Sequence, residues 1–343
     1  MFEIDPLRDR RWNTLIENHP NASVFHRAEW LHALNSAYGY EPVAVSSCSA
    51  DSPLGNALVF CRIRSVLTGN RFVSLPFSDH CEPLVNSNEE MEFLVGNMKG
   101  KVDQTRWKYF EIRPVSATPA VQKLLAMNNS YFFHRLNLRR TEEELFKSFH
   151  KDCVQRKIRR ADRELVRYEV GTSETVLNQF YRLLLLTRRR QKIPPQPLRW
   201  FRTLIASFGK DLKIRVALKD KVPIASILTL CHKKTMTYKY GCSDAKFNSL
   251  GGTVFLFWKT IQEAKAEGFE ELDMGRSDID NSGLVTFKEH WGAERSVLTY
   301  WRYPSGPTTP KHEQMMRIMG QMVSVAPDAA LTALGSLLYR HIG

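Results

Sequence analysis

Short apolar runs and amphipathic stretches alternate along the first 140 residues. Runs rich in β-branched and aromatic residues between Gly, Pro, Asn and Ser clusters predict strands. These strands are expected at about 42–48, 57–67, 71–76, 107–113 and 131–138, with helices at 27–37 and 88–99. Thr141-Glu-Glu-Glu144 forms a capping box before an apolar stripe, so a second unit is expected to begin near residue 140.

The alternation continues after residue 140 in a different order. Helices are predicted at 151–166, 173–191, 197–208 and 251–267, and strands at 212–218, 223–231, 235–242 and 270–274. Short polar turns at 219–221 and 232–234 predict hairpins, so this part of the sheet is expected to be antiparallel. The order is typical of an acyltransferase lobe, and the fold class expected is mixed α/β (α+β).

The end of the chain reads as a linker and a helical tail. Tyr303-Pro-Ser-Gly-Pro-Thr-Thr-Pro310 is a linker by composition. In the tail, one apolar stripe contains Leu331, Leu334, Leu337 and Leu338. We expect it to pack on the body of the protein, with peripheral contact to a membrane as the alternative. The division expected is 1–140 for an N-terminal lobe, 141–303 for a C-terminal lobe and 304–343 for the linker and tail.

The composition of the 343 residues excludes several classes of protein. With 43% hydrophobic and 25% charged residues, neither a disulfide-stapled miniprotein nor a disordered chain fits. The six cysteines contain no Cys-x-x-Cys pair, so no metal site and no disulfide framework are expected. Because the N-terminus is charged, no secretory signal is expected, and no apolar run is long enough to span a bilayer. A cytoplasmic protein is expected, and the alternative is a cytoplasmic protein located at the inner face of the membrane.

The net charge of +13 favours anionic partners. Residues 135–192 hold 16 Lys or Arg against 8 Asp or Glu. Basic positions of the helix at 151–166 (Arg156, Lys157, Arg159, Arg160 and Arg163) oppose the apolar positions Val154, Ile158, Ala161 and Leu165. We interpret the basic face as solvated, with docking of transfer RNA, an acyl carrier protein or a lipid pyrophosphate as the alternative. No DNA-binding signature is visible, so no DNA partner is expected.

Candidate chemistry gathers around two segments of the C-terminal half. Gly251 and Gly252 open a helix whose N–H groups suit a phosphate or an oxyanion, although a tight strand-to-helix connection also explains them. Farther on, Arg276 can clamp a phosphate or carboxylate, Lys288 can hold an oxyanion, and Asp278 can take a proton. A loop ion pair between Arg276 and Asp278 and a solvated Lys288 are the structural alternatives.

Three further groups offer polar side chains. Asp79 and His80 lie in a loop suited to an acceptor or a proton relay, whereas the adjacent Cys81 is interpreted as a small buried residue. Tyr238 and Tyr240 are expected on one face of a strand, mainly as packing residues with a tethered hydroxyl. Among Arg188, Arg189 and Arg190, at least one is expected to point inward with a partner for its charge.

Residues 10 to 303 resemble the Fem-type peptidyltransferases and their BioF-like acetyltransferase relatives, within the GNAT superfamily. The resemblance rests on Phe25-His-Arg-Ala-Glu-Trp30, Leu75-Pro-Phe-Ser-Asp-His-Cys-Glu-Pro83, Thr187-Arg-Arg-Arg-Gln191 with Pro194-Pro-Gln-Pro197, Gly275, Phe287-Lys288 and the stretch from Tyr240 to Trp291. It implies two GNAT-like lobes with a substrate cleft between them, and it places Phe287 and Lys288 at the acceptor and acyl-transfer site. The coenzyme A loop of GNAT enzymes, Gln/Arg-x-x-Gly-x-Gly/Ala, is matched imperfectly by Asn248-Ser-Leu-Gly251-Gly252-Thr253.

These observations lead to one expected function and one alternative. The chain is expected to transfer an acyl or aminoacyl group, from acyl-CoA or aminoacyl-tRNA, to an amine or less readily a hydroxyl of a cell-envelope or polysaccharide precursor. The alternative is a non-catalytic binding protein for an anionic lipid-linked or nucleotide ligand. The expected catalytic residues are Lys288, Asp278 and Asp79; the substrate-binding residues are Phe287, Arg276, His80, Trp30, Arg188 and Tyr240; the cofactor-binding residues are Asn248, Gly251 and Gly252.

Overall fold

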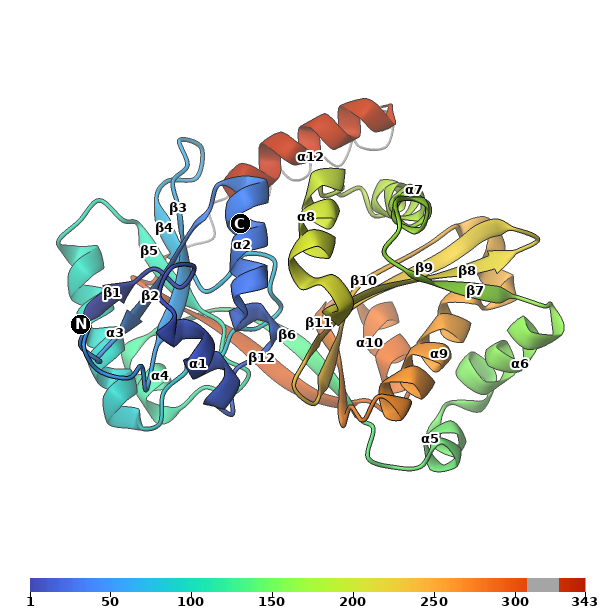
Figure 1. Cartoon of the computed structure of the whole chain (residues 1–343), viewed down its shortest axis with the longest axis horizontal. Coiled ribbons are helices and arrows are strands. Elements are labelled where there is room, and N and C mark those ends of the chain that lie inside the picture. Colours follow the sequence, from blue (N-terminus) through green and yellow to red (C-terminus); the bar gives the residue numbers. More distant parts are fainter. Residues whose placement is uncertain (307–326, 343) are drawn as a thin grey trace. The chain divides into compact units, whose positions relative to one another are not determined.

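The computed structural model describes residues 1–306 and 327–342, which form two compact units (Figure 1). Unit 1 contains Met1–Tyr131 with the described parts of Val297–Thr309 and Gly335–Gly343. Unit 2 contains Phe132–Ser296 with the described part of Pro310–Leu334. No helix in these described ranges is both long and apolar enough to cross a membrane.

Unit 1 is a mostly antiparallel sheet with helices. Its strands are β1 (Phe2–Ile4), β2 (Glu41–Ser46), β3 (Leu58–Ile63), β4 (Arg71–Val73), β5 (Tyr109–Ile112) and β12 (Glu294–Tyr303), in the order β1-β2-β3-β4-β5-β12. Only β4 and β5 pair in parallel among these. The helices are α1 (Arg11–Asn18), the 3-10 turn η1 (Val24–His26), α2 (Ala28–Tyr38), α3 (Asn88–Asp103) and α4 (Pro119–Leu124). The last strand of this sheet therefore comes from the far end of the chain.

The core of unit 1 lies between its sheet and α3. Phe60, Phe72 and Phe110 come from three different strands, and the ring of Phe60 meets the other two edge to face at 6.1 Å. The apolar stripe of α3, which includes Met91 and Leu94, covers these rings. Burial of such side chains contributes about 1.5–3 kcal/mol each.

The strands of unit 2 follow one another in the order β6-β11-β10-β9-β8-β7. Its strands are β6 (Ala126–Asn137, which begins in unit 1), β7 (Arg167–Gly171), β8 (Leu212–Lys219), β9 (Val222–His232), β10 (Thr235–Ser243) and β11 (Glu271–Asp278). The helices are α5 (Glu142–Ser148), the π-helix η2 (Lys151–Gln155), α6 (Arg156–Arg163), α7 (Glu174–Gln191), α8 (Leu198–Phe208), α9 (Gly252–Ala266) and α10 (Ser282–Glu289), with 3-10 turns η3 (Gly209–Asp211) and η4 (Ala245–Leu250). β7 to β10 pair antiparallel, and β10 pairs with β11 in parallel.

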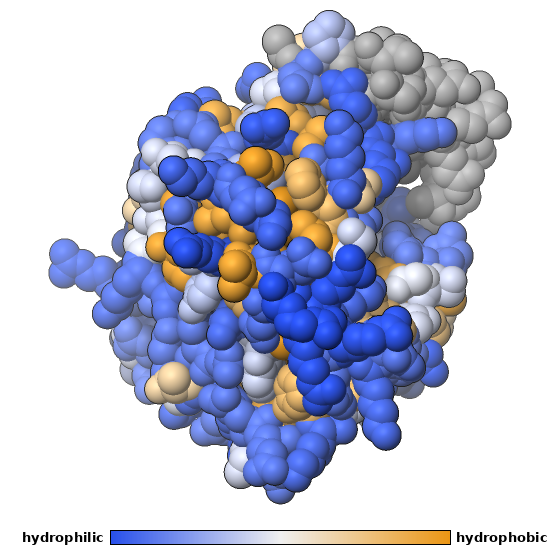
Figure 2. All heavy atoms as spheres, turned by 90° about the vertical axis from the view of Figure 1, so that its right-hand side faces the viewer, coloured by the Kyte–Doolittle hydropathy of each residue, from blue (hydrophilic) through white to orange (hydrophobic). Residues whose placement is uncertain are grey.

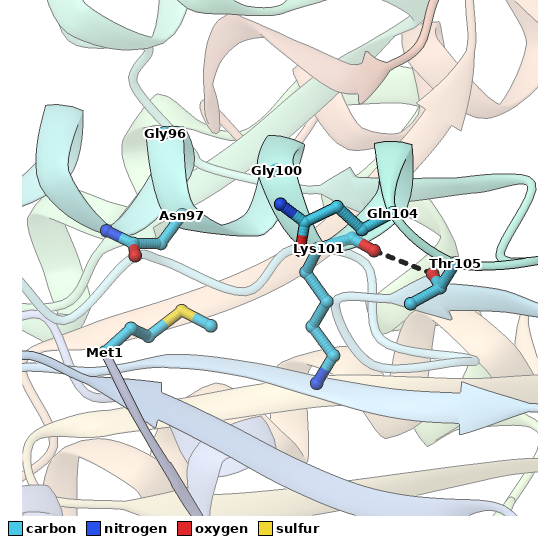
Figure 3. A pocket seen from close by; sticks show the side chains of 7 residues that line it. All are labelled: Met1, Gly96, Asn97, Gly100, Lys101, Gln104 and Thr105. Carbon is cyan, nitrogen blue, oxygen red and sulfur yellow. Dashed lines mark hydrogen bonds between the residues drawn. The ribbon is translucent and has the colours of Figure 1, made fainter.

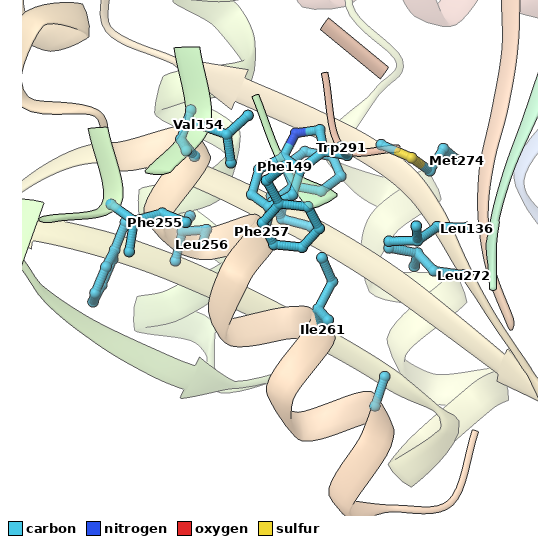
Figure 4. Packing of buried hydrophobic residues seen from close by; sticks show 14 of the residues in the cluster. Leu136, Phe149, Val154, Phe255, Leu256, Phe257, Ile261, Leu272, Met274 and Trp291 are labelled. Atoms are coloured by element: carbon cyan, nitrogen blue, oxygen red, sulfur yellow. The ribbon is translucent and has the colours of Figure 1, made fainter. Parts of the chain in front are cut away.

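The helices of unit 2 cover both faces of its sheet. In Figure 1, α7 and α8 lie on one face, and α9 and α10 lie on the other. Under α9 and α10, the indole of Trp291 packs between Phe149 at 4.9 Å and Phe257 at 5.5 Å, beside Leu136 and Met274 (Figure 4). This aromatic cluster fixes the end of α10 against the sheet.

The sequence predicted most of these elements. The helices at 27–37, 173–191 and 197–208 are confirmed to within one residue, as are the two hairpins that join β8, β9 and β10. The Thr141 capping box is also confirmed, since the Glu144 N–H donates to Oγ1 at 3.2 Å and the Thr141 N–H donates to the Glu144 carboxylate at 2.8 Å. Mixed α/β is therefore the correct class.

Some predictions were wrong or incomplete. Leu165 was expected on the buried side of α6, but the helix ends at Arg163 and Leu165 is 75% exposed, with φ at 55°. In the tail, α12 (Asp328–Ile342) buries Leu331 and Leu338, whereas Leu337 is 59% exposed. Residues 307–326, which include the second half of the expected linker, lie outside the described residues. No range was predicted for β1, α1, α4, β7, α10 and β12.

Candidate functional site

Two neighbouring strands of unit 2 part along their length. β10 and β11 share three register pairs, from Thr235–Glu271 to Thr237–Asp273. β10 then continues to Ser243 and β11 to Asp278 without further pairing between them. Beyond Thr237 and Asp273 the two strands are no longer register partners, so an extended ligand can lie between them.

A β-bulge lies where the strands part. The pairing of β10 with β9 shifts between Tyr238 and Tyr240, which leaves Lys239 as the extra residue. Since one extra residue reverses the alternation of side chains, Tyr238 and Tyr240 lie on opposite faces. Tyr238 packs on Phe257 of α9 at 4.7 Å, whereas the Tyr240 hydroxyl accepts a hydrogen bond from Trp200 Nε1 of α8 at 2.9 Å. The expectation that they share a face was wrong.

Lys288 holds the kinked edge of β11. Its Nζ donates to the carbonyl oxygens of Gly275 at 2.7 Å and Arg276 at 2.9 Å, and the side chain is only 2% exposed. Gly275 has φ of 71°, which breaks the regular strand and brings consecutive carbonyls to one donor. A solvated Lys288 is therefore excluded. The ammonium fixes main chain where β11 has left β10.

His134 is a polar residue of this region that the sequence analysis missed. It belongs to β6, the neighbour of β11 in the sheet, and is fully buried, and among the described residues neither ring nitrogen has a hydrogen-bond partner. Burial, with the nearby charges of Lys288 and Arg295, lowers the pKa of His134 from 6.5 to about 4. The sequence contained a signal for this residue. His134 precedes Leu136 by two positions and Leu138 by four, so in a strand it lies on the same apolar face as these leucines.

The low pKa of His134 predicts a pH-dependent stability. The unfolded chain takes up this proton below pH 6.5 while the folded chain stays neutral down to about pH 4, so folding stability falls across this interval. The loss expected is about 2 kcal/mol. Urea unfolding of wild type and His134→Leu at pH 7 and pH 4.5 checks this, with His32→Gln as control. Equal losses in wild type and His134→Leu would show that His134 is not responsible.

The expected cofactor-binding glycines lie at the beginning of α9. Gly251 has φ of 75°, and a Cβ there would stand 2.9 Å from the Lys157 carbonyl oxygen. A Cβ on Gly252 would stand 2.9 Å from Ile224 Cδ1. The N–H of Gly251 donates to Asn248 O at 3.2 Å, so it is not free for a ligand. The glycines thus permit close packing, and the first N–H groups of α9 itself remain for an anion.

Two arginines of α7 surround the end of β10 that leads to α9. Arg190 donates to the Ser243 carbonyl at 3.3 Å. Arg188 is half-buried and donates to Gln191 at 3.1 Å and Gln196 at 3.4 Å. The charges of both arginines act to lower the pKa of the buried Cys242 thiol, against a larger rise caused by burial. Positive charge is therefore concentrated at this end of the strand.

The remaining expected residues of unit 2 follow β11. Phe287 is half-buried and packs on Phe257 at 5.3 Å, Arg276 is half-buried, and Asp278 is exposed at the end of the strand. The structure therefore brings Arg276, Asp278, Phe287 and Lys288 to one end of β11 and to α10. Tyr240 instead belongs to the packing between the sheet and α8.

The residues expected in the first lobe form a group of their own in unit 1. Trp30 and His80 are buried against the ring of Phe25, at 5.0 and 5.3 Å. Asp79 is half-buried, and its carbonyl accepts from the Tyr300 hydroxyl at 2.7 Å. Burial raises the pKa of the neighbouring Cys81 to about 12, so the thiol is not a nucleophile, in agreement with its interpretation as a packing residue.

Two surface features lie outside this site. A hollow of about 500 Å³ on α3 of unit 1 is lined by Met1, Gly96, Asn97, Gly100, Lys101, Gln104 and Thr105 (Figure 3). The ammonium group of Lys101 in this hollow pairs with Glu3, so the hollow offers little chemistry.

Figure 2 shows one face of the molecule on which hydrophilic side chains surround an apolar area. In unit 2, all five basic residues of α6 named above are exposed, as the solvated interpretation predicts.

Comparison with known proteins now identifies the domain. The family described as "Acetyltransferase (GNAT) domain" matches residues 148–289, from α5 to α10. This chain carries a GNAT acetyltransferase domain. The match includes the opening between β10 and β11, the start of α9, and Lys288. It confirms the expected acyltransferase class. None of the curated protein sequences is similar enough to count as a relative.

Solved structures share the fold over most of the chain. FemX has a TM-score of 0.67 at 13% identity, over 92% of this chain and 100% of its own. A C-terminal domain assigned to a lysylphosphatidylglycerol synthetase of Agrobacterium fabrum has a TM-score of 0.55 at 13% identity, over 93% of this chain and 95% of its own. A tandem GNAT protein from the clavulanic acid biosynthesis pathway has a TM-score of 0.55 at 9% identity, over 90% of this chain and 98% of its own. The expected resemblance to Fem-type and tandem GNAT folds is thus confirmed.

Proposed function

We propose that this GNAT chain transfers an aminoacyl or acyl group from an anionic carrier to an amine on a cell-envelope or polysaccharide precursor. The observation that carries the proposal is the opening between β10 and β11, whose far edge is held by Lys288. An extended acyl donor fits between two strands that are no longer register partners, because it can lie alongside one of them as a further strand.

The anionic part of the donor is assigned to the start of α9. This helix follows β10 through η4, and its free N–H groups and dipole favour a phosphate. Arg190 and Arg188 supply positive charge at the preceding end of β10. Asn248, Gly251 and Gly252 shape this turn and allow the close approach that a bound pyrophosphate or tRNA end needs.

The chemistry follows from attack of the amine on the donor carbonyl. Main-chain N–H groups of β10 beyond the bulge would hold the developing oxyanion. Lys288 acts as a positioning residue, since its donors are directed to the carbonyls of Gly275 and Arg276. The proton leaves the amine toward Asp278. Phe287 and Arg276 are proposed to contact the acceptor substrate, whereas His80 and Trp30 are buried within unit 1.

The similar folds favour an aminoacyl donor. FemX and the lysylphosphatidylglycerol synthetase domain cover almost the whole chain, and the second name denotes a product in which lysine is attached to a lipid. Such an acceptor belongs to the cell envelope. We therefore place aminoacyl-tRNA before acyl-CoA as the donor, and an envelope precursor before other acceptors.

The proposal is tested by binding and by turnover. Thermal unfolding is followed with acetyl-CoA, long-chain acyl-CoA, acyl carrier protein and aminoacyl-tRNA, each with and without lipid-linked or nucleotide-linked amino sugars. A donor at a hundred times its dissociation constant adds about 2.7 kcal/mol of stability. The expected result is stabilisation by a donor and a mass-resolved amide product with an acceptor. Stabilisation without consumption would instead support the binding-protein alternative, and no response to any donor would refute the proposal.

A further inference from the structure

Three side chains of types that bind transition metals meet beside the end of α10. His150, Cys153 and His290 each bring one ligand atom into a group whose members lie within 4.8 Å of one another. His150 caps the start of η2, Cys153 lies within it, and His290 follows the last residue of α10. The proposed acyl transfer uses none of the three.

The backbone holds the two segments of this cluster together. The His150 N–H donates to the His290 carbonyl oxygen at 2.9 Å, and the two imidazole rings lie 4.2 Å apart at 45°. The N–H groups of Val154 and Gln155 both donate to the His150 carbonyl. The ligand atoms are therefore carried by short side chains on a fixed main chain, which lowers the entropy that a bound ion must overcome.

The donor set selects the metal. Two imidazole nitrogens and one thiolate suit Zn²⁺, whereas Mg²⁺ and Ca²⁺ prefer oxygen ligands. His150 is exposed and the other two residues are half-buried, so an ion can enter from solvent. Near His290, the negative charge of Glu289 opposes the positive charge of Lys157.

We propose that His150, Cys153 and His290 form a binding site for Zn²⁺, with a fourth position open to water. The sequence analysis expected no metal site because it considered cysteine pairs, and this cluster combines one cysteine with two histidines 140 positions apart along the chain. A bound ion joins η2 to the end of α10, two residues beyond Lys288.

Two proton-linked events accompany binding. At present His150 Nδ1 accepts a hydrogen bond from the Cys153 N–H at 3.2 Å. Coordination through Nδ1 takes up its lone pair, and coordination through Nε2 requires a proton on Nδ1, so this hydrogen bond is given up in either case. Cys153 releases its proton to solvent and binds as the thiolate, so affinity falls as the pH is lowered.

The test uses the full chain with any affinity tag removed. Co²⁺ is titrated as a spectroscopic probe, and Zn²⁺ is then titrated against a chromophoric chelator. The expected results are one ion per chain and a sulfur-to-cobalt charge-transfer absorption that Zn²⁺ displaces. In Cys153→Ser this absorption disappears and Zn²⁺ affinity falls by at least about 100-fold, since even outer-shell changes cost 10–100-fold.

Matched variants separate the cluster from adventitious binding. Cys48→Ser removes a partly exposed thiol of unit 1 and is expected to leave both signals unchanged. His150→Gln changes an exposed side chain and is expected to weaken Zn²⁺ binding as Cys153→Ser does, with circular dichroism confirming that both variants fold. Absence of cobalt–thiolate absorption in wild type, or its persistence in Cys153→Ser, would overturn the proposal.

Discussion

Replacing Lys288 with methionine is expected to lower the rate of acyl transfer by about a hundred-fold, because a misplacement of about 1 Å near the reacting groups costs about that much. Methionine keeps the apolar stem of the side chain but cannot donate to the carbonyl oxygens of Gly275 and Arg276. Those carbonyls then face the interior without a donor, and the kink of β11 beside the opening is no longer fixed. Stability is expected to fall by about 2 kcal/mol, since buried groups lose their partner.

The measurement separates chemistry from binding. Steady-state rates give kcat and KM with the donor and acceptor found by the turnover test, and urea unfolding gives the stability. A positioning role predicts a larger effect on kcat than on KM, because the donor carrier is held elsewhere, at the start of α9. Lys259→Met is the matched control, since this half-buried lysine of α9 donates only to Gln262 among the contacts described. A normal kcat in Lys288→Met would remove Lys288 from the mechanism.

Replacing Gly251 with alanine is expected to lower the free energy of unfolding by about 3 kcal/mol. About 1 kcal/mol comes from the left-handed backbone at φ of 75°, which L side chains avoid. The rest, about 2 kcal/mol, comes from a Cβ placed 2.9 Å from the Lys157 carbonyl oxygen, a main-chain atom that cannot rotate away. The start of α9 must shift, so donor binding is expected to weaken as well.

Gly268 offers a closely matched control for this prediction. It follows the same helix α9, has φ of 79°, and an added Cβ would meet nothing within 4 Å. Gly268→Ala therefore carries the backbone cost without the close contact and is expected to lose about 1 kcal/mol. Urea unfolding of both variants, at unchanged m-values, gives the difference. If both variants lose the same free energy of unfolding, α6 and the turn before α9 accommodate the added Cβ of Gly251→Ala without a loss of stability.

Local patterns predicted the parts of the fold that depend on neighbours in sequence. The hairpins of β8, β9 and β10 were predictable because apolar stretches alternate with short polar turns at 219–221 and 232–234. The bulge at Lys239 was not, because Tyr238-Lys-Tyr240 reads as a regular strand. β7 was missed since Arg167 to Gly171 is an exposed edge strand without a clear apolar face.

The candidate site was predictable in its residue types but not in its geometry. The resemblance pointed to Phe287 and Lys288, yet nothing in the sequence shows that the lysine is buried against two carbonyls of β11. His134 could have been found from its spacing to Leu136, as an inward polar residue on an apolar face. His290 and Cys153 could not have been paired, since only the fold brings their two segments together.

The last strand of unit 1 has a consequence for synthesis of the protein on the ribosome. Trp301 of β12 pairs with Ile112 of β5, so the sheet of unit 1 stays open at that edge until residues 132–296 of unit 2 have been made. Pairings this distant along the chain form slowly, and an open strand edge favours association with other chains. During synthesis, the edge of β5 therefore stays exposed until β12 has been made. A chain truncated before residue 301 is expected to aggregate, even though most of unit 2 is present.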